Sequence, residues 1–234
     1  MSSTAEARVV ALIPAHDDAP RIEPVIRAAA KHLPVIVVDD GSTDDTADVA
    51  RAAGATVIEQ HPNQGKGAAL RAGFRRALDD GAVHAILTLD ADGQHDPVEI
   101  PRFLAAFEVG RPDLVIGRRN FRTMPPTRRL SNNLGRLAFS WAVGRDIPDN
   151  QSGYRLVSRR LAEATLQSEE HGFAFEVEQI TTCIRMGGTI AWVPIRTIYA
   201  GEPSHIRPVA HLREFVRIVR EARREVREPL TPTS

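Results

Sequence analysis

Two aspartates one residue apart, Asp90 and Asp92, close an apolar run in residues 87–97 (LTLDADGQHDP). If a strand continued through them, both carboxylates would lie on one face, where like charges disfavour ionisation. A cation removes that penalty, and two carboxylates with the oxygen of Gln94 suit a hard divalent ion such as Mg²⁺ or Mn²⁺. Magnesium commonly completes its coordination with substrate phosphates. The segment therefore predicts a metal site for a phosphorylated ligand.

Helix capping is the structural alternative for these aspartates. Asp96 before Pro97 already supplies a cap for the next helix, which leaves Asp90 and Asp92 without that role. The single cysteine, Cys183, argues against structural zinc, excludes an intrachain disulfide and permits a reducing compartment.

Two further polar segments carry possible ligand contacts. In residues 39–46 (DDGSTDDT), Ser42 or Thr43 can cap the following helix, whereas Asp39 and Asp40 can accept hydrogen bonds from a base or ribose. Residues 63–67 (NQGKG) can cradle a phosphate through backbone amides at a helix N-terminus, or form a loop with a solvated lysine. Neither segment has the glycine spacing of a P-loop or of a GxGxxG dinucleotide site.

Strands and helices alternate in the first half of the chain. Apolar runs predict strands at residues 8–13, 35–39, 55–59, 82–90 and 113–117, and helical patterns predict helices at 20–32, 44–53, 67–80 and 97–107. This order predicts an α/β fold with a mostly parallel sheet and helices on both faces. Ligands bind beyond the carboxyl ends of such strands, where PAHDD, DDGSTDDT and DADGQHD fall.

The second half predicts helices at 127–144, 175–186 and 209–226, and strands at 153–157 and 189–195. Residues 118–129 (RRNFRTMPPTRR) form a loop with five arginines around two prolines. We expect one domain over 1–228, with a ligand-binding half at 8–117, a second half at 118–208, a C-terminal amphipathic helix at 209–228 and a disordered tail at 229–234.

Composition limits the class of protein. Of 234 residues, 42% are hydrophobic, and thirty acidic residues balance thirty basic ones, so no global field attracts nucleic acid. No run approaches the roughly 20 apolar residues of a membrane span, and the N-terminus lacks signal-peptide architecture. We expect a soluble, cytoplasmic protein.

Seven segments in this order resemble family 2 glycosyltransferases, and within them the dolichyl-phosphate mannosyltransferase and polyprenyl-phosphate glycosyltransferase group. They are LIPAHDD, VVDDGSTDDT, NQGKGAALRAGF, LTLDADGQHDP, VIGRR, DNQSGYRL and SHIRP. The resemblance implies a single-domain glycosyltransferase A fold, which is Rossmann-like, and a nucleoside diphosphate sugar, such as a UDP- or GDP-sugar, as donor.

The resemblance also assigns roles. It implies nucleotide-sugar binding by Pro14, Asp17, Asp18, Asp40, Lys66, Asp90 and Arg119, a metal held by Asp90, Asp92 and Gln94, and phosphate contacts by Arg118 or Arg119 and by Arg207. Where this chain has Asp17 and Asp18, the family commonly has Asn-Glu. The shorter acid at Asp18 reaches less far than glutamate does.

Glycosyl transfer builds negative charge on the departing diphosphate, which a metal at Asp92 and an arginine such as Arg118 would stabilise. A hydroxyl acceptor also needs a general base, for which Asp149, Glu176 and Glu178 are available. A lipid phosphate is already anionic and needs cations instead. Arginines suited to that phosphate are Arg128, Arg129, Arg136 and Arg207.

We therefore expect an inverting, metal-dependent transfer of a hexose to polyprenyl or dolichyl phosphate at the cytoplasmic face of a membrane. Residues 134–143 and 211–226 either contact the bilayer surface or pack on the core, and a separate membrane protein is a further possible partner. The alternatives are transfer to a saccharide or small-molecule hydroxyl with Asp149 as base, a nucleotidyltransferase, and a non-catalytic nucleotide-sugar-binding protein.

Overall fold

A seven-stranded sheet forms the centre of the molecule, in the order β3-β2-β1-β4-β6-β5-β7. The computed structural model describes residues 8–120, 126–168, 170, 174–196 and 208–227. The strands are β1 Arg8–Ala15, β2 Val35–Asp40, β3 Thr56–Gln60, β4 Val83–Thr88, β5 Leu114–Arg119, β6 Arg155–Ser158 and β7 Ile190–Ile195. All pairings are parallel except those of β6, which runs antiparallel to β4 and β5. The predicted mostly parallel α/β sheet is confirmed.

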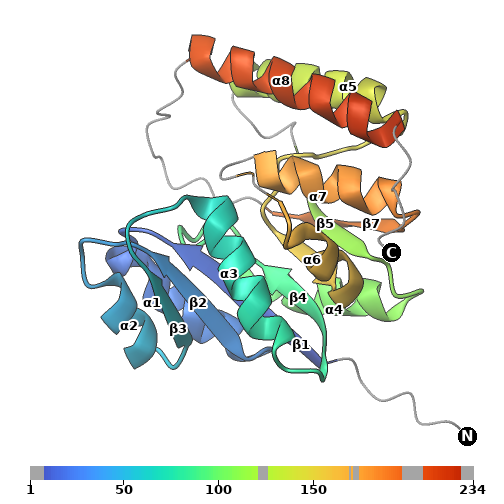
Figure 1. The fold of residues 1–234 in the computed structure, drawn as a ribbon. Helices are drawn as coiled ribbons and strands as arrows, with labels where there is room; N and C mark the ends of the chain where they lie inside the picture. The colour runs from blue at the N-terminus through green and yellow to red at the C-terminus, as the bar shows by residue number, and fades with distance from the viewer. Residues whose placement is uncertain (1–7, 121–125, 169, 171–173, 197–207, 228–234) are drawn as a thin grey trace, which may run out of the picture.

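Helices cover both faces of the sheet (Figure 1). Their bounds are α1 Ala19–Ala29, α2 Thr46–Ala52, α3 Lys66–Leu78, α4 Ile100–Glu108, α5 Pro126–Val143, α6 Arg159–Thr165, α7 Ala174–Arg185 and α8 Pro208–Arg227, with a short 3₁₀ turn, η1, at Pro97–Glu99. Helices α1, α2 and α4 contribute to the core on one face, and α3, α5, α6 and α7 to the core on the other. Helix α8 lies along α5 and contacts α7 (Figure 1).

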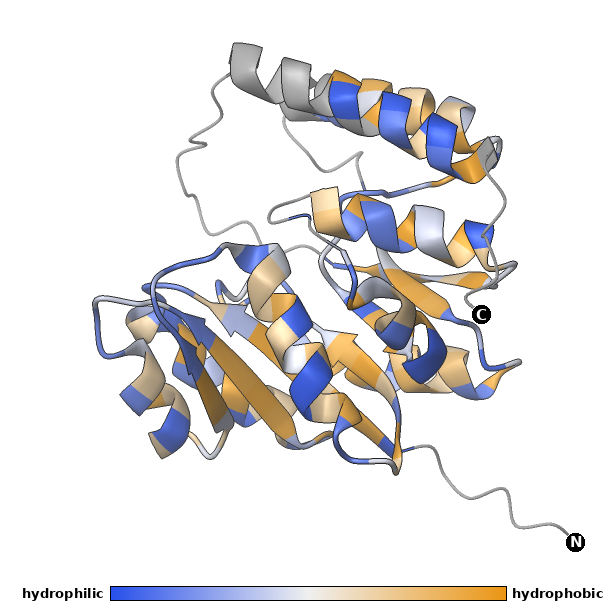
Figure 2. Ribbon diagram, viewed as in Figure 1, coloured by the Kyte–Doolittle hydropathy of each residue, from blue (hydrophilic) through white to orange (hydrophobic). Residues whose placement is uncertain are grey.

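Strand alternation divides the core into these two layers. In β1, Val9, Ala11 and Ile13 face one layer, whereas Val10 and Leu12 face the other. The central strands are accordingly hydrophobic along most of their length (Figure 2). A sheet buried on both faces leaves its strand ends as the place for polar side chains.

The strand predicted over residues 82–90 ends earlier, at Thr88. Residues 91–93 form a turn in which Gly93 has a φ of +77°, and the Gln94 backbone N–H donates to Asp92 Oδ1 at 2.9 Å. The expectation that strand alternation sets the direction of both aspartates was therefore wrong. Turn geometry brings Asp90 and Asp92 to the sheet edge.

The N-cap residues predicted from the sequence agree with those of the structure at η1 and differ from them at α2. Asp96 caps η1, accepting the Val98 N–H at 3.0 Å, as predicted. The predicted cap of α2 by Ser42 or Thr43 is wrong, because Asp45 occupies that position. Helix α6 was not predicted, and it starts where Ser158 accepts the Leu161 N–H at 3.2 Å.

Helix α3 packs on β1 through Gly73. A Cβ at Gly73 would lie 2.2 Å from Cδ1 of Leu12, a side chain with no exposed surface. We expect Gly73→Ala to lower the free energy of unfolding by about 1–2 kcal/mol, because overpacking costs about 2–3 kcal/mol and better helix propensity offsets about 1. Urea unfolding measures this change. Gly81→Ala is the control, since a Cβ at Gly81 meets no atom within 4 Å; equal effects of the two changes would contradict the packing argument.

Candidate functional site

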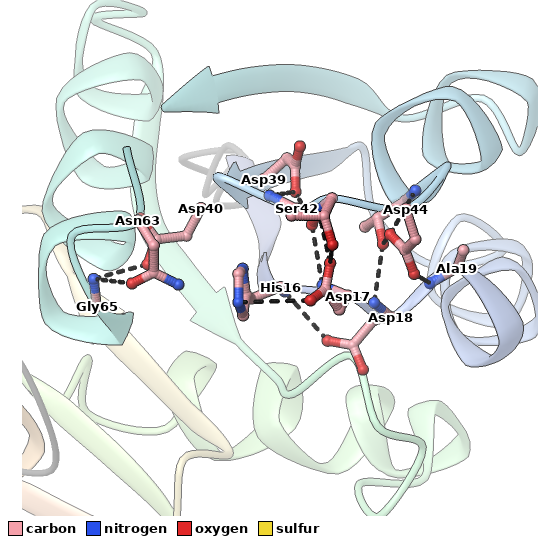
Figure 3. Close-up of polar contacts among 12 residues, drawn as sticks. His16, Asp17, Asp18, Ala19, Asp39, Asp40, Ser42, Asp44, Asn63 and Gly65 are labelled. Atoms are coloured by element: carbon pink, nitrogen blue, oxygen red, sulfur yellow. Dashed lines mark hydrogen bonds and ion pairs between the residues drawn. The ribbon is translucent and has the colours of Figure 1, made fainter. Parts of the chain in front are cut away.

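The loops after β1 and β2 are joined by hydrogen bonds at the carboxyl edge of the sheet (Figure 3). Asp17 Oδ1 accepts the Thr43 N–H at 2.7 Å, and the Asp17 N–H donates to Ser42 Oγ at 2.9 Å. The Asp18 N–H donates to Thr46 Oγ1 at 2.8 Å. The bond from Thr43 lowers the pKa of Asp17, which therefore stays ionised.

The residues predicted to line a nucleotide pocket gather at this edge. Pro14 is buried within β1, and Asp17 is exposed with a φ of +52°, a left-handed conformation that aspartate tolerates. The Asp18 carboxylate accepts from Arg21 at 2.6 Å and from the His16 N–H at 3.3 Å, so it is already bonded to its own loop and to the first turn of α1.

Asp40 fixes the loop that precedes α3. Its two carboxylate oxygens accept the Gln64 N–H at 2.8 Å and the Gly65 N–H at 2.7 Å. These two amides point at Asp40, so they are not directed at a phosphate as the cradle interpretation expected. Asp40 instead places Lys66, the first residue of α3, at the edge of the sheet.

Lys66 lies between two carboxylates. Its Nζ is 2.6 Å from Asp90 Oδ1 and 2.8 Å from Glu176 Oε1. Burial alone would raise the pKa of Asp90, but the Lys66 ammonium outweighs it and lowers that pKa to about 2. Burial alone would lower the pKa of Lys66, but Asp90 and Glu176 raise it above its usual value. Lys66 and Asp90 are therefore both charged near neutral pH.

The neighbours of Asp90 complete this corner of the site. His95 is buried, and its Nδ1 accepts the Asp90 N–H at 3.2 Å. Burial lowers the pKa of His95, which favours the neutral ring. Burial raises the pKa of Asp92, and the nearby charge of Asp90 adds to that rise.

This donor set fits a hard divalent cation. Asp90 and Asp92 offer carboxylate oxygens, and a cation would relieve the effects that raise the Asp92 pKa. The described residues contain no cluster of three or more histidine, cysteine or acidic side chains able to hold a metal. The rest of the coordination would come from Gln94, water or phosphate oxygens, as magnesium commonly accepts.

A pocket of about 630 Å³ has a basic wall that includes Arg119, whose charge helps to lower the pKa of Asp90. Its lining includes Arg118, Arg119, Arg129, Arg136, Asp146 and Pro148. Arg136 is paired with Asp146 at 2.9 Å. Arg118 and Arg129 are exposed. The side chain of Arg128 and the whole of Arg207 lie outside the described residues.

Asp149 lies behind Arg119 and has no exposed surface. Its Oδ2 accepts Arg119 Nε–H at 2.7 Å, and its Oδ1 accepts Arg119 Nη2–H at 2.8 Å. The backbone N–H groups of Arg119 and Gln151 also donate to Asp149, at 3.2 and 3.1 Å. This bidentate contact fixes the guanidinium at the pocket wall.

Sequence reasoning missed two residues that shape the site. A Cβ at Gly153 would lie 2.9 Å from Lys66 Nζ and 3.0 Å from Asp90 Oδ2, so a larger residue there would displace this ion pair. Arg155 is fully buried and donates to the backbone oxygens of Ser152 and Asn150, at 2.7 and 3.2 Å. An arginine at the start of an apolar strand was the available signal.

Comparison with known proteins shows the family of this chain. Residues 10–166 match the family model described as glycosyl transferase family 2. The chain belongs to this family. It is 32% identical over 206 residues to an undecaprenyl-phosphate mannosyltransferase of Micrococcus luteus, covering 80% of this chain and 82% of that protein. It is also 27% identical to a UDP-N-acetylglucosamine–dolichyl-phosphate N-acetylglucosaminyltransferase of Methanococcus voltae, covering 83% of this chain and 87% of that one.

The fold also matches a solved glycosyltransferase. A crystal structure of glucosyl-3-phosphoglycerate synthase from Mycobacterium tuberculosis, with Mn²⁺, UDP-glucose and phosphoglyceric acid, superposes with a TM-score of 0.71 at 23% identity. The match covers 95% of this chain and 81% of that one. The glycosyltransferase A fold implied by the sequence is confirmed, and this chain is a family 2 glycosyltransferase.

Proposed function

We propose that this glycosyltransferase transfers a hexose from a nucleoside diphosphate sugar to the phosphate of a polyprenyl lipid, with inversion at the anomeric carbon and with Mg²⁺ or Mn²⁺. The observation that carries the proposal is the arginine-walled pocket, one of whose arginines, Arg119, acts electrostatically on Asp90. The named function of the relative from M. luteus supports a lipid phosphate as acceptor.

The donor binds at the carboxyl edge of β1, β2 and β4. Asp17, Asp18 and Asp40 shape the nucleotide side of this edge through the loops that they hold together. Asp90 and Asp92 hold the metal, which when bound supplies positive charge for the departing diphosphate. Lys66 and Arg119 add fixed positive charge on the same side, so the leaving group separates in an environment that already stabilises it.

The acceptor phosphate binds in the basic pocket. Arg118, Arg119 and Arg129 offer planar guanidinium groups that suit a phosphate, and Arg128, Arg136 and Arg207 are proposed to assist them. A phosphate oxygen attacks the anomeric carbon as the bond to the diphosphate breaks, and no proton needs to be removed from a dianionic acceptor. The pocket then serves to hold and align the nucleophile.

The hydroxyl acceptor is supported less well by this geometry. A general base at Asp149 needs a carboxylate oxygen within reach of the acceptor proton. Asp149 is instead buried and already accepts four hydrogen bonds, two of them from the Arg119 side chain. A small phosphorylated acceptor would place the same phosphate group in the pocket. It differs from the lipid only in the group that carries this phosphate.

The test is turnover of a panel of UDP- and GDP-sugars with Mn²⁺ and three acceptors. These are a short-chain polyprenyl phosphate, the matching polyprenol and 3-phosphoglycerate. We expect product with the polyprenyl phosphate and none with the polyprenol. Transfer to polyprenol or to 3-phosphoglycerate, without transfer to the lipid phosphate, would overturn the proposal.

An apolar stripe on α5 supports contact with a membrane surface. Leu134, Leu137 and Trp141 lie along one side of α5 and are 59%, 55% and 64% exposed. The Arg223 guanidinium of α8 stacks over the Trp141 ring at 3.7 Å. Arg129 and Arg136 of the pocket belong to the same helix. An interfacial helix of this kind would bring a lipid phosphate to the pocket.

No helix in the described part of the chain meets the length and hydropathy of a bilayer span.

Charge placed on this stripe tests the contact. We expect the double change Leu134→Glu and Leu137→Glu to lower co-sedimentation with vesicles containing polyprenyl phosphate by about tenfold, because a charge opposes insertion into the interface. The control is Val109→Glu, at a valine that is 79% exposed beyond α4. Equal sedimentation of the wild type and both variants would contradict the role of α5.

A further inference from the structure

The Lys66 ammonium joins the two halves of the site. Asp90 follows β4, within residues 8–117 that are proposed to bind the donor, whereas Glu176 belongs to α7, within residues 118–208. Both carboxylates lie within ion-pair distance of Nζ, at 2.6 and 2.8 Å. The contact is therefore a bridge across the site.

The surroundings of Lys66 restrict the position of its ammonium group. Gly153 closes one side, because even a methyl group there would lie 2.9 Å from Nζ. The side chain of Lys66 is 28% exposed and that of Glu176 is 3% exposed. The ammonium is thus held in place by a buried carboxylate, while Asp90 faces the more open side.

The Glu176 carboxylate makes few interactions other than its ion pair with Lys66. Its Oε2 is buried and has no hydrogen-bond partner among the described residues. A buried carboxylate is costly unless it is paired, and Lys66 is the partner found for it. This arrangement favours a role for Glu176 that acts through Lys66.

We propose that Lys66, anchored by Glu176, is a built-in counter-ion of Asp90 that makes metal binding depend on the donor diphosphate. The inference rests on the proposed function, because it takes Asp90 and Asp92 as the metal ligands. Glu176 is a positioning residue in this scheme, since it acts on the metal site through Lys66.

Charge explains the coupling. Lys66 already compensates part of the Asp90 charge and repels a second cation placed there. A diphosphate brings negative charge that attracts both the metal and the ammonium, so each ligand strengthens the other by the same factor. Without Lys66, the metal meets an uncompensated Asp90. Without the charge of Glu176, the repulsion from Lys66 is stronger.

The experiment measures Mn²⁺ affinity by electron paramagnetic resonance of free Mn²⁺, with and without saturating UDP or GDP. In Lys66→Met we expect Mn²⁺ alone to bind about tenfold more tightly than in the wild type. The factor by which the nucleotide increases the affinity for Mn²⁺ should fall by about the same amount. In Glu176→Gln we expect Mn²⁺ alone to bind more weakly. Lys31→Met is the control, because Lys31 is exposed and is the other lysine of the chain.

Lys66→Met leaves a buried carboxylate without its partner, so a double variant, Lys66→Met with Glu176→Gln, guards against loss of folding. It too is expected to bind Mn²⁺ alone more tightly than the wild type. Wild-type affinity for Mn²⁺ alone in both Lys66 variants, or weaker affinity, overturns the coupling. A wild type that binds no Mn²⁺ with either nucleotide overturns the proposed metal-dependent donor site itself.

Discussion

Asp92→Asn is expected to lower kcat by about 10³-fold and to abolish the stabilisation of the protein by a nucleotide sugar with Mn²⁺. Asp92 is a carboxylate that the turn after β4 brings beside Asp90, and burial raises its pKa. Loss of one element of electrostatic stabilisation at a leaving group typically costs 10²–10³-fold in rate, and loss of a metal ligand adds to that. Thermal shift with and without Mn²⁺ measures the binding effect, because a ligand of the folded state raises stability.

Asp96→Asn is the matched control for this prediction. It removes a carboxylate four residues further along the same segment, where Asp96 Oδ1 only accepts the Val98 N–H at 3.0 Å. Asparagine caps helices as well as aspartate does, so stability and activity should change little. If both variants lose the metal-dependent shift equally, general loss of negative charge explains the effect and Asp92 has no specific role.

Much of the fold could be predicted because its signals are local. Apolar runs marked each strand, and the polar clusters PAHDD, DDGSTDDT and DADGQHD identified the sheet edge. Parallel pairing of β1 with β2 and β4 then brings these clusters together. The sequence order alone was enough to place Asp17, Asp40 and Asp90 at one edge.

Contacts between segments that are far apart in the sequence could not be predicted from local patterns. Asp40 was expected at a nucleotide base, yet its oxygens already bind the amides of Gln64 and Gly65. Glu176 was a candidate general base, yet its Oε1 lies 2.8 Å from Lys66 Nζ. Neither partner is signalled by spacing, because both depend on how the loops fold over the strand ends.

The direction of the aspartates after β4 shows a different limit. A strand pattern continued in the sequence through Asp90, but the chain turns at residues 91–93. The apolar run supplies no signal for where pairing stops, since Leu89 remains buried beyond the end of β4. Gly93, with its φ of +77°, was the residue that marked the turn.

Asp149→Ala is expected to lower kcat/KM for the acceptor by about 100-fold, chiefly through a higher acceptor KM. The change releases the Arg119 guanidinium from the carboxylate that holds it at the pocket wall, at 2.7 and 2.8 Å. A misplacement of about 1 Å in a positioning group can cost about 10²-fold. Steady-state kinetics with varied acceptor at saturating donor separates KM from kcat.

Asp149→Asn separates a positioning role from base catalysis. The asparagine oxygen can still accept from Arg119 or from the Gln151 N–H, so we expect this variant to recover about tenfold of the activity that Asp149→Ala loses. An amide cannot take a proton from a hydroxyl acceptor, and loss of a general base costs 10²–10⁴-fold. If the asparagine and alanine variants have equally low kcat and an unchanged acceptor KM, Asp149 is the general base. That result would exclude a phosphate acceptor, because a phosphate needs no base.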